Sequence, residues 1–165
     1  MNPGRRKKGG YFSADADMPS PPPPVVVRLK QRIRFSDVDP MGILWHGRYA
    51  QLFEQANEEI GRQCAMTYAD FHSEHLVAPI VQFHVDYFLP VLLGEEVEIV
   101  GRMIWSDAAR LNIEYEIHKQ TGELAAAGYT VQMFVDEAGM PLVASPPLHE
   151  KCRKRWLSGE FGGLR

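Results

Sequence analysis

Residues 32–57 read RIRFSDVDPMGILWHGRYAQLFEQAN, and this segment decides the fold because a strand pattern ends in it and a helix pattern begins in it. Upstream, in residues 25–35, apolar side chains alternate with basic ones, which predicts a strand with one buried face. Downstream, from Tyr49 to Ile60, apolar side chains recur at i, i+3, i+4, i+7 and i+11, which predicts an amphipathic helix. A turn-rich link therefore joins a strand to a helix.

Further strand patterns follow this helix. They lie in residues 81–89, 97–105, 111–117 and 124–135. Turn residues separate them, and the last three runs are close enough in sequence to form an antiparallel meander. Because no helices alternate with the later strands, a doubly wound sheet is excluded. The predicted class is α+β, with a single long helix packed on one face of an antiparallel sheet.

The two ends of the chain differ in composition from the middle. Residues 1–24 combine a basic cluster with small residues and four consecutive prolines, which predicts a disordered tail whose removal leaves folding unchanged. Residues 25–144 have the length and pattern of one domain. Residues 145–165 begin with a proline pair and are expected to be a C-terminal extension with at most weak helical character.

The overall composition restricts the class of function. The chain has 18 basic and 21 acidic residues and a net charge of -3, so no global positive field predicts binding to nucleic acid or to an anionic membrane. No apolar run is long enough for a membrane span. Cys64 and Cys152 match neither a metal-binding nor a disulfide spacing and are expected to be free thiols in a reducing compartment. The expected location is the cytoplasm.

The link between the first strand and the helix carries the densest group of chemically useful residues. Asp37, Asp39 and His46 stand directly before the predicted helix start, together with two glycines. A helix N-terminus presents unpaired N–H groups and a partial positive charge, which suit a carbonyl oxygen that is becoming negative. The alternative is that both aspartates only cap or close the turn.

The same segment resembles the signature of 4-hydroxybenzoyl-CoA thioesterase and of the acyl-CoA thioesterases associated with the Tol-Pal system. The shared features are a strand ending in aromatic-x-D-x-D, a small residue and glycine, an apolar pair, an aromatic residue, His or Tyr, and a later Tyr. The stretch FHVDYFLPVLLGEEVEI at residues 83–99 resembles the family's second strand and the start of its third. The resemblance covers residues 25–140 and implies the hotdog fold, in which an antiparallel five-stranded sheet wraps around one long helix.

The resemblance also implies roles for individual residues. Asp39 matches the aspartate that attacks the thioester carbonyl or activates water, and a backbone N–H at the helix start, at His46 or Gly47, holds the carbonyl oxygen. Trp45 and Tyr49 match aromatic positions beside the substrate. A thioester has a good leaving group, so a carboxylate and one oriented dipole are sufficient without a metal or any cofactor beyond the coenzyme A of the substrate. The chain contains no Gly-x-Ser-x-Gly nucleophile motif.

Three site residues have open alternatives. The His46 side chain has either a chemical or a structural role, and its backbone N–H is the favoured functional group. Glu54 lies on the helix, where a related branch of hotdog thioesterases places its catalytic glutamate, or it is an ordinary exposed acid. Arg110 is the one basic residue left where the family has a short basic run for the CoA phosphates. Other candidates for this contact are Lys119, Lys151, Arg153, Lys154 and Arg155, and a solvated surface explains each equally well.

The predicted function is hydrolysis of an acyl- or aroyl-CoA to the free acid and CoA. The resemblance implies an active site shared between subunits of a homodimer or homotetramer. One alternative is a hotdog acyl-thioester dehydratase, although Asp39 followed by Pro-Met-Gly fits the thioesterase pattern better. The other is a non-catalytic module that binds acyl-CoA.

Overall fold

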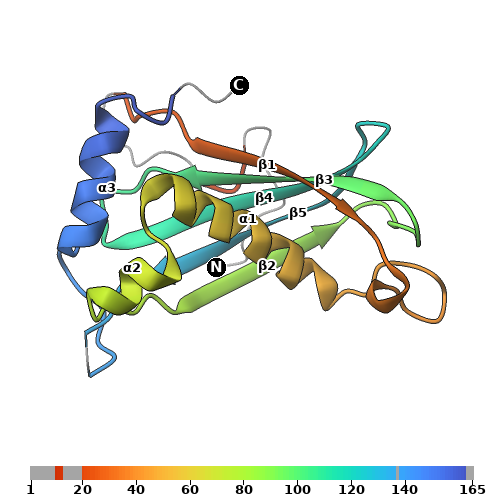
Figure 1. Cartoon of the computed structure of the whole chain (residues 1–165), viewed down its shortest axis with the longest axis horizontal. Helices are drawn as coiled ribbons and strands as arrows, with labels where there is room; N and C mark the ends of the chain where they lie inside the picture. The colour runs from red at the N-terminus through yellow and green to blue at the C-terminus, as the bar shows by residue number, and fades with distance from the viewer. Residues whose placement is uncertain (1–9, 13–19, 137, 163–165) are drawn as a thin grey trace.

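The computed structural model describes residues 10–12, 20–136 and 138–162, which fold around one antiparallel sheet (Figure 1). The strand order is β1-β3-β4-β5-β2. The strands are β1 (Val25–Arg32), β2 (Ile80–Tyr87), β3 (Glu96–Ile104), β4 (Arg110–Lys119) and β5 (Leu124–Met133). The helices are α1 (Arg48–Cys64), α2 (Tyr68–Ser73) and α3 (Pro147–Leu157), with a short 3-10 turn η1 (Phe35–Asp37). The predicted α+β class, five-stranded sheet and long central helix are confirmed.

Helix α1 lies across one face of the sheet, against β1, β3 and β4. The predicted apolar stripe is its buried face, which comprises Tyr49, Leu52, Phe53, Ala56, Ile60, Gly61 and Cys64. A glycine in each of two strands lets the helix approach closely. A Cβ on Gly101 would lie 3.0 Å from the Ala56 Cβ, and one on Gly128 would lie 2.7 Å from the Phe53 ring. The Phe53 ring stacks on Tyr115 at 4.4 Å, so this contact fixes the helix over the middle of the sheet.

Helix α1 ends where the backbone turns left-handed. Ala65 has φ 54° and donates its N–H to the carbonyls of Arg62 and Gly61. This is the usual way in which a helix satisfies its last carbonyl groups. The chain then enters α2, whose N-cap Thr67 accepts the Asp70 N–H while the Asp70 carboxylate accepts the Thr67 N–H.

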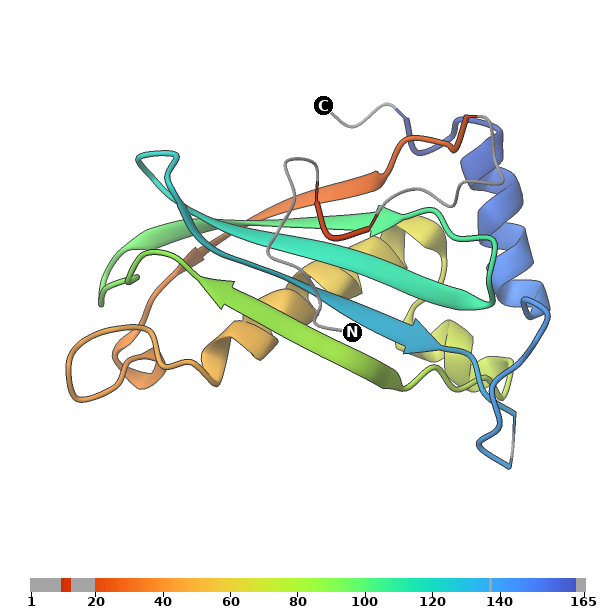
Figure 2. The same ribbon diagram turned by 180° about the vertical axis from the view of Figure 1, so that it is seen from behind.

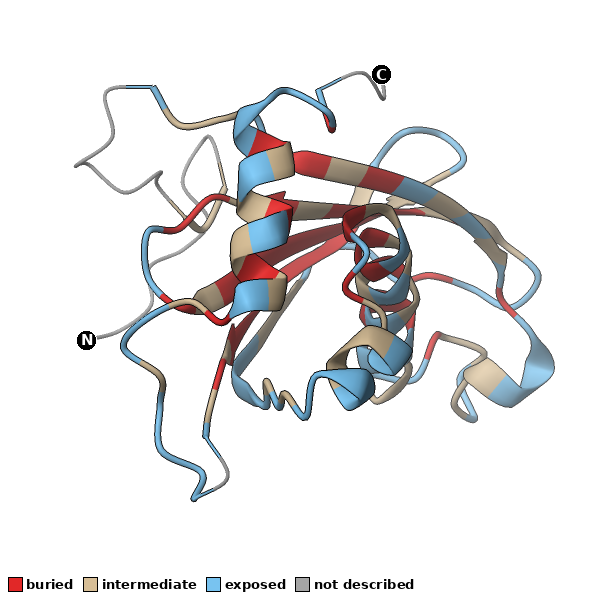
Figure 3. Ribbon diagram, turned by 60° about the vertical axis from the view of Figure 1, so that its left-hand side comes forward, coloured by how far each residue is buried: buried red, intermediate tan, exposed pale blue. Residues whose placement is uncertain are grey.

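Helix α3 is a clear difference from the expectation of weak helical character in residues 145–165. Pro147 occupies the first helical position, which favours helix initiation, and His149, Cys152 and Trp156 form a buried stripe. Figure 3 shows red, buried bands along α3, which lies beside the sheet. Trp156 packs edge-on against Trp105 at 5.3 Å and donates its indole N–H to the Pro23 carbonyl at 2.7 Å. Tertiary contacts thus stabilise a helix in which five of the eleven residues are charged.

Much of the tail predicted to be disordered, residues 1–9 and 13–19, lies outside the described residues. Residues 10–12 lie on the face of the sheet opposite α1 (Figure 2). The backbone N–H groups of Tyr11 and Phe12 both donate to one oxygen of Glu114, at 2.5 and 2.7 Å. The Tyr11 hydroxyl donates to Asp86 at 2.6 Å. Within the described part of the chain, no helix is long and apolar enough to cross a bilayer.

Candidate active site

The loop that contains Asp39 is a small hairpin between β1 and α1. Val38 and Leu44 form an antiparallel bridge, and the Asp39 N–H donates to the Ile43 carbonyl at 2.8 Å. Gly42 takes φ +74° at the tip, a conformation that other residues rarely adopt. The hairpin also bonds to the link before β3: the Leu44 N–H donates to the Val91 carbonyl at 2.8 Å. The hairpin that carries Asp39 is therefore closed by its own backbone bonds and tied to the link before β3.

The two aspartates of the hairpin differ in their bonding. The Asp37 carboxylate accepts the Arg34 N–H at 2.8 Å and lies 3.5 Å from Nε of Arg48. Arg48 is the first residue of α1, and its guanidinium also donates to the Ser36 carbonyl at 2.8 Å. Asp37 thus ties the strand end to the helix start, which is a structural role.

Asp39 commits only one carboxylate oxygen to the loop. Its Oδ1 accepts the N–H groups of Met41 at 2.8 Å and Ile43 at 3.4 Å. Its Oδ2 has no hydrogen-bond partner among residues 10–12, 20–136 and 138–162. The carboxylate is therefore oriented by the turn and still has an oxygen that can act on a substrate.

Free backbone donors lie at the start of α1, a few residues after Asp39. The Arg48 N–H donates to the Trp45 carbonyl at 2.8 Å and the Tyr49 N–H to the His46 carbonyl at 3.4 Å. By contrast, the N–H groups of His46 and Gly47 have no acceptor within the described residues. They are unsatisfied donors at the positive end of the helix dipole, as an oxyanion site requires.

The predicted aromatic residues lie around these donors. The Trp45 ring lies over Gly47 and fills the space that a Cβ would take. The exposed His46 ring lies 5.1 Å from Trp45. Tyr49 is buried and meets Tyr87 of β2 edge-on at 4.9 Å. Burial raises the pKa of Tyr49 to about 12, with a contribution from Tyr87, so the Tyr49 phenol stays protonated at neutral pH.

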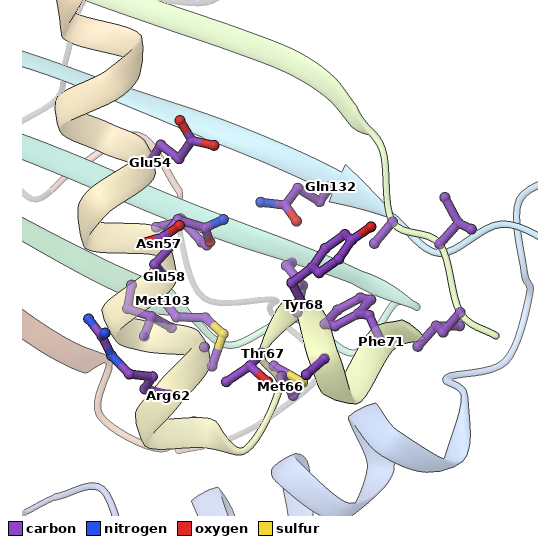
Figure 4. A pocket seen from close by; sticks show the side chains of 18 of the residues that line it. Glu54, Asn57, Glu58, Arg62, Met66, Thr67, Tyr68, Phe71, Met103 and Gln132 are labelled. Atoms are coloured by element: carbon purple, nitrogen blue, oxygen red, sulfur yellow. The ribbon is translucent and has the colours of Figure 1, made fainter. Parts of the chain in front are cut away.

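A cavity of about 950 Å³ lies along the C-terminal half of α1, between that helix, α2 and the sheet (Figure 4). Its apolar lining includes Met66, Phe71, Leu76, Met103, Leu111 and Ile113. Glu54 and Asn57 extend from α1 toward the strand that carries Gln132. Glu54 is exposed, and no described residue forms a hydrogen bond or ion pair with its carboxylate.

Comparison with known proteins assigns the family of the chain. The family model of the thioesterase-like superfamily matches residues 33–154. The chain belongs to this superfamily. It is 22% identical over 136 residues to "Putative acyl-CoA thioesterase YneP" of Bacillus subtilis (strain 168), covering 78% of this chain and 99% of YneP.

Solved structures of thioesterases share the fold. The DHNA-CoA thioesterase of Staphylococcus aureus superposes with a TM-score of 0.71 at 24% identity, covering 85% of this chain and 97% of that one. A thioesterase of Thermus thermophilus, complexed with coenzyme A and Zn, gives a TM-score of 0.62 at 26% identity over 76% of this chain and 96% of that one. The predicted hotdog fold and the predicted resemblance to hotdog thioesterases are confirmed.

The two candidate carboxylates occupy different parts of the thioesterase domain. Asp39 precedes α1, whereas Glu54 lies six residues beyond Arg48, or about 9 Å along the helix axis. Glu54 lines the cavity and the Asp39 hairpin does not. Asp39, Trp45, His46, Gly47 and Tyr49 are thus grouped at the helix start, and Glu54 stands apart from them.

The structure places Arg110 far from this group. Arg110 begins β4 and pairs with Met133, whereas the Asp39 hairpin follows Arg32, which pairs with Glu96 at the other end of the sheet. The Arg110 Nε donates to Ser106 Oγ at 3.2 Å. Within one chain, Arg110 therefore does not join the residues at the helix start.

Sequence reasoning did not identify the residues that close the cavity. Half of the residues that line it lie in residues 66–79, in the turn before α2, in α2 and in the link to β2. The pattern Thr67-x-x-Asp70 is a capping signal and could have located α2. Because α2 has only six residues, it has no apolar periodicity of its own.

Proposed function

We propose that this chain hydrolyses an acyl- or aroyl-CoA to the free acid and CoA, with Asp39 as the nucleophile or general base. One observation carries the proposal. Asp39 is held in a rigid hairpin by one carboxylate oxygen, and the same short segment presents the unsatisfied N–H groups of His46 and Gly47. A carboxylate opposite an oxyanion site is the minimum that thioester hydrolysis needs.

The proposed reaction begins when the thioester carbonyl oxygen accepts the N–H of His46 or Gly47. The donors and the helix dipole stabilise the negative charge that develops on this oxygen. Asp39 Oδ2 either attacks the carbonyl carbon or removes a proton from a water molecule that does so. The C–S bond then breaks and CoA leaves as a thiolate that takes a proton. If Asp39 is the nucleophile, water hydrolyses the resulting acyl anhydride and restores the carboxylate.

We place the acyl group in the cavity beside α1. Its volume of about 950 Å³ suits a group much larger than acetyl. Apolar side chains line much of it, so each methylene that enters would be removed from water. Glu54 stands at this cavity with a free carboxylate, which makes it the alternative catalytic acid or base.

The proposed functional unit is a homo-oligomer whose smallest form is a dimer. The β2 edge of the sheet carries the half-exposed side chains Ile80, Val81 and Phe83, which suit an antiparallel contact with a second copy. Tyr87 at the end of β2 touches Tyr49 in the first turn of α1. A second subunit at β2 would therefore lie beside the helix start. The proposal includes no metal and no cofactor other than the CoA of the substrate.

A hydrolysis panel tests the proposal. Benzoyl-CoA, acetyl-CoA and medium- and long-chain acyl-CoA are offered to the full chain, and thiol release is followed. We expect turnover of larger acyl groups at a kcat/KM well above that for acetyl-CoA. Binding of these compounds without any thiol release would contradict the hydrolase and favour a non-catalytic acyl-CoA-binding module.

A further inference from the structure

The two cysteines of the chain come from distant parts of the sequence and meet in one buried seam. Cys64 is the last residue of α1, and Cys152 lies in the middle of α3. Each has 1% of its surface exposed, and both belong to the same apolar core. The sequence contains no other cysteine. Any disulfide within this chain must therefore join these two residues.

Independent contacts hold α3 against the end of α1 at this point. Arg155 follows Cys152 by three residues, so both side chains lie on one face of α3. The Arg155 guanidinium donates to the carbonyls of Cys64 at 3.0 Å and Gln63 at 3.3 Å. Glu160 fixes the same guanidinium with contacts of 2.7 and 3.0 Å. The face of α3 that carries Cys152 is thus fixed on the last turn of α1.

The two thiols also influence each other's ionisation, and unequally. The neighbouring Cys152 thiol raises the pKa of Cys64, and burial raises it further. Cys64 in turn lowers the pKa of Cys152 against the opposing effect of burial, and the Arg155 charge also lowers it. A thiolate is the nucleophile in thiol–disulfide exchange, so Cys152 is the residue expected to react first.

We propose that Cys64 and Cys152 form a reversible disulfide that clamps α3 onto the end of α1. With a small disulfide such as oxidised glutathione as the oxidant, the Cys152 thiolate attacks one sulfur and releases one glutathione thiolate. Cys64 then gives up its proton, and its thiolate attacks the Cys152 sulfur of the mixed disulfide and releases the second glutathione. The protein loses two hydrogens in total, and one glutathione disulfide is reduced to two thiols.

The proposed Cys64–Cys152 disulfide would lie next to the wall of the cavity beside α1. Arg62 and Met66, on either side of Cys64, line the cavity beside α1. The disulfide would connect that wall to α3 and close a long loop of chain, which restricts the unfolded state strongly. The inference concerns the stability of the folded chain and does not depend on the proposed hydrolase activity.

The test incubates the full chain with oxidised glutathione, with and without urea at a concentration below the unfolding transition. Low urea is included because both thiols are buried and α3 must open transiently before exchange. We expect no free thiols after oxidation, an intact mass lower by two hydrogens, and a Cys64–Cys152 cross-linked peptide. The melting temperature should rise by roughly 5–15 °C and return to its original value with dithiothreitol.

Two matched variants give the order of reaction. Cys64→Ser keeps Cys152 and should accumulate a glutathione adduct, whereas Cys152→Ser should stay unmodified under the same conditions. Neither variant should gain melting temperature with the oxidant. Two free thiols in the oxidant-treated wild type in both buffers would overturn the proposal. So would cross-links between chains, or a disulfide that lowers the melting temperature.

Discussion

Asp37 and Asp39 are two residues apart, yet the hairpin uses them in different ways. Asp37 bonds to Arg34 and Arg48 and joins the strand end to the helix start. Asp39 gives one oxygen to the turn and keeps the other. The alternative that both aspartates only cap or close the turn therefore accounts for both oxygens of Asp37 but for only one oxygen of Asp39. Of the two aspartates, only Asp39 therefore keeps an oxygen available for the proposed chemistry.

A pair of isosteric variants tests which carboxylate performs the chemistry. Asp39→Asn keeps a side-chain oxygen that can accept the Met41 N–H but removes the charge. We expect its kcat to fall by at least about a hundredfold while acyl-CoA binding survives. Glu54→Gln should cost much less, since Glu54 stands apart from the donors at the helix start. Thiol release and calorimetric binding measure the two effects.

The matched control for this pair is Asp37→Asn. It should lower the melting temperature, because it weakens the link to Arg48, with a loss of roughly 1 kcal/mol. If Glu54→Gln is nearly inactive and Asp39→Asn only impaired, the helix glutamate is the catalytic group. All variants must keep the wild-type circular dichroism spectrum for this comparison to count.

His149 is expected to make the protein sensitive to acid. Its ring is buried against Phe134, and Nδ1 lies 3.1 Å from Ser145 Oγ. Burial, and then the Arg153 charge, lower the pKa of His149 to about 4 from 6.5. The unfolded chain then binds more protons between these values, so stability is complete above pH 6.5 and falls as the pH drops toward 4. The loss amounts to at most about 3 kcal/mol.

Melting temperatures measured from about pH 7.5 to about pH 4 check this expectation. His149→Gln removes the titrating group, so its melting temperature should change less with pH than that of the wild type. His46→Gln is the control, because His46 is exposed and its loss should leave the wild-type pH dependence intact. Parallel curves for wild type and His149→Gln would contradict the assignment.

At the scale of elements, the sequence predicts the strands and the helix in which apolar residues recur at regular spacing. It does not predict the helices that lack such a pattern. Each strand was located within a few residues, because one buried face imposes alternation. The stripe from Tyr49 to Ile60 located α1 for the same reason. Helix α3 has only three buried side chains among eleven residues, so its stability comes from partners such as Trp105 that sequence alone cannot assign.

The sequence does not predict the contacts of residues 10–12 either, because these residues also lack a periodic apolar pattern. Tyr11 and Phe12 are two aromatic residues in a polar stretch, and no period marks them as buried. In the structure both rings pack on Tyr129, at 5.1 and 5.2 Å, and their N–H groups satisfy Glu114. A buried carboxylate without donors is costly, so these contacts contribute to stability.

Removal of residues 1–19 is therefore expected to destabilise the fold, contrary to the expectation from sequence. The deletion strips Tyr11 and Phe12 from the sheet and keeps the Pro23 contact with Trp156. We expect a loss of about 2 kcal/mol and a melting temperature lower by several degrees. Differential scanning calorimetry measures it. Removal of residues 1–9 is the control, since it keeps these contacts, and equal melting temperatures for both deletions would refute the role of Tyr11 and Phe12.

At the scale of the whole molecule, the two edges of the sheet are different. The β1 edge carries Arg28 and Lys30, which pair with Glu98 and Glu96 on β3. Charged side chains discourage a sheet edge from pairing with another chain. The β2 edge instead presents half-exposed apolar side chains, including Val81 at 49%. This asymmetry indicates which edge suits a second copy, and the contact between Tyr87 and Tyr49 connects that edge to the helix start.

Val81→Lys tests the proposed role of this edge. A lysine at this position puts a charge on the apolar edge strand, which discourages pairing with a second copy, so the dimer should dissociate. Val143→Lys is the matched control, because Val143 is 100% exposed and is not part of β2. Light scattering should show a dimer or tetramer for wild type and Val143→Lys, and a monomer for Val81→Lys. Hydrolysis by the monomer should be strongly reduced although Asp39 and its hairpin are unchanged, because the second subunit would no longer flank the helix start. An active Val81→Lys monomer would separate catalysis from assembly and would place the complete site within one chain.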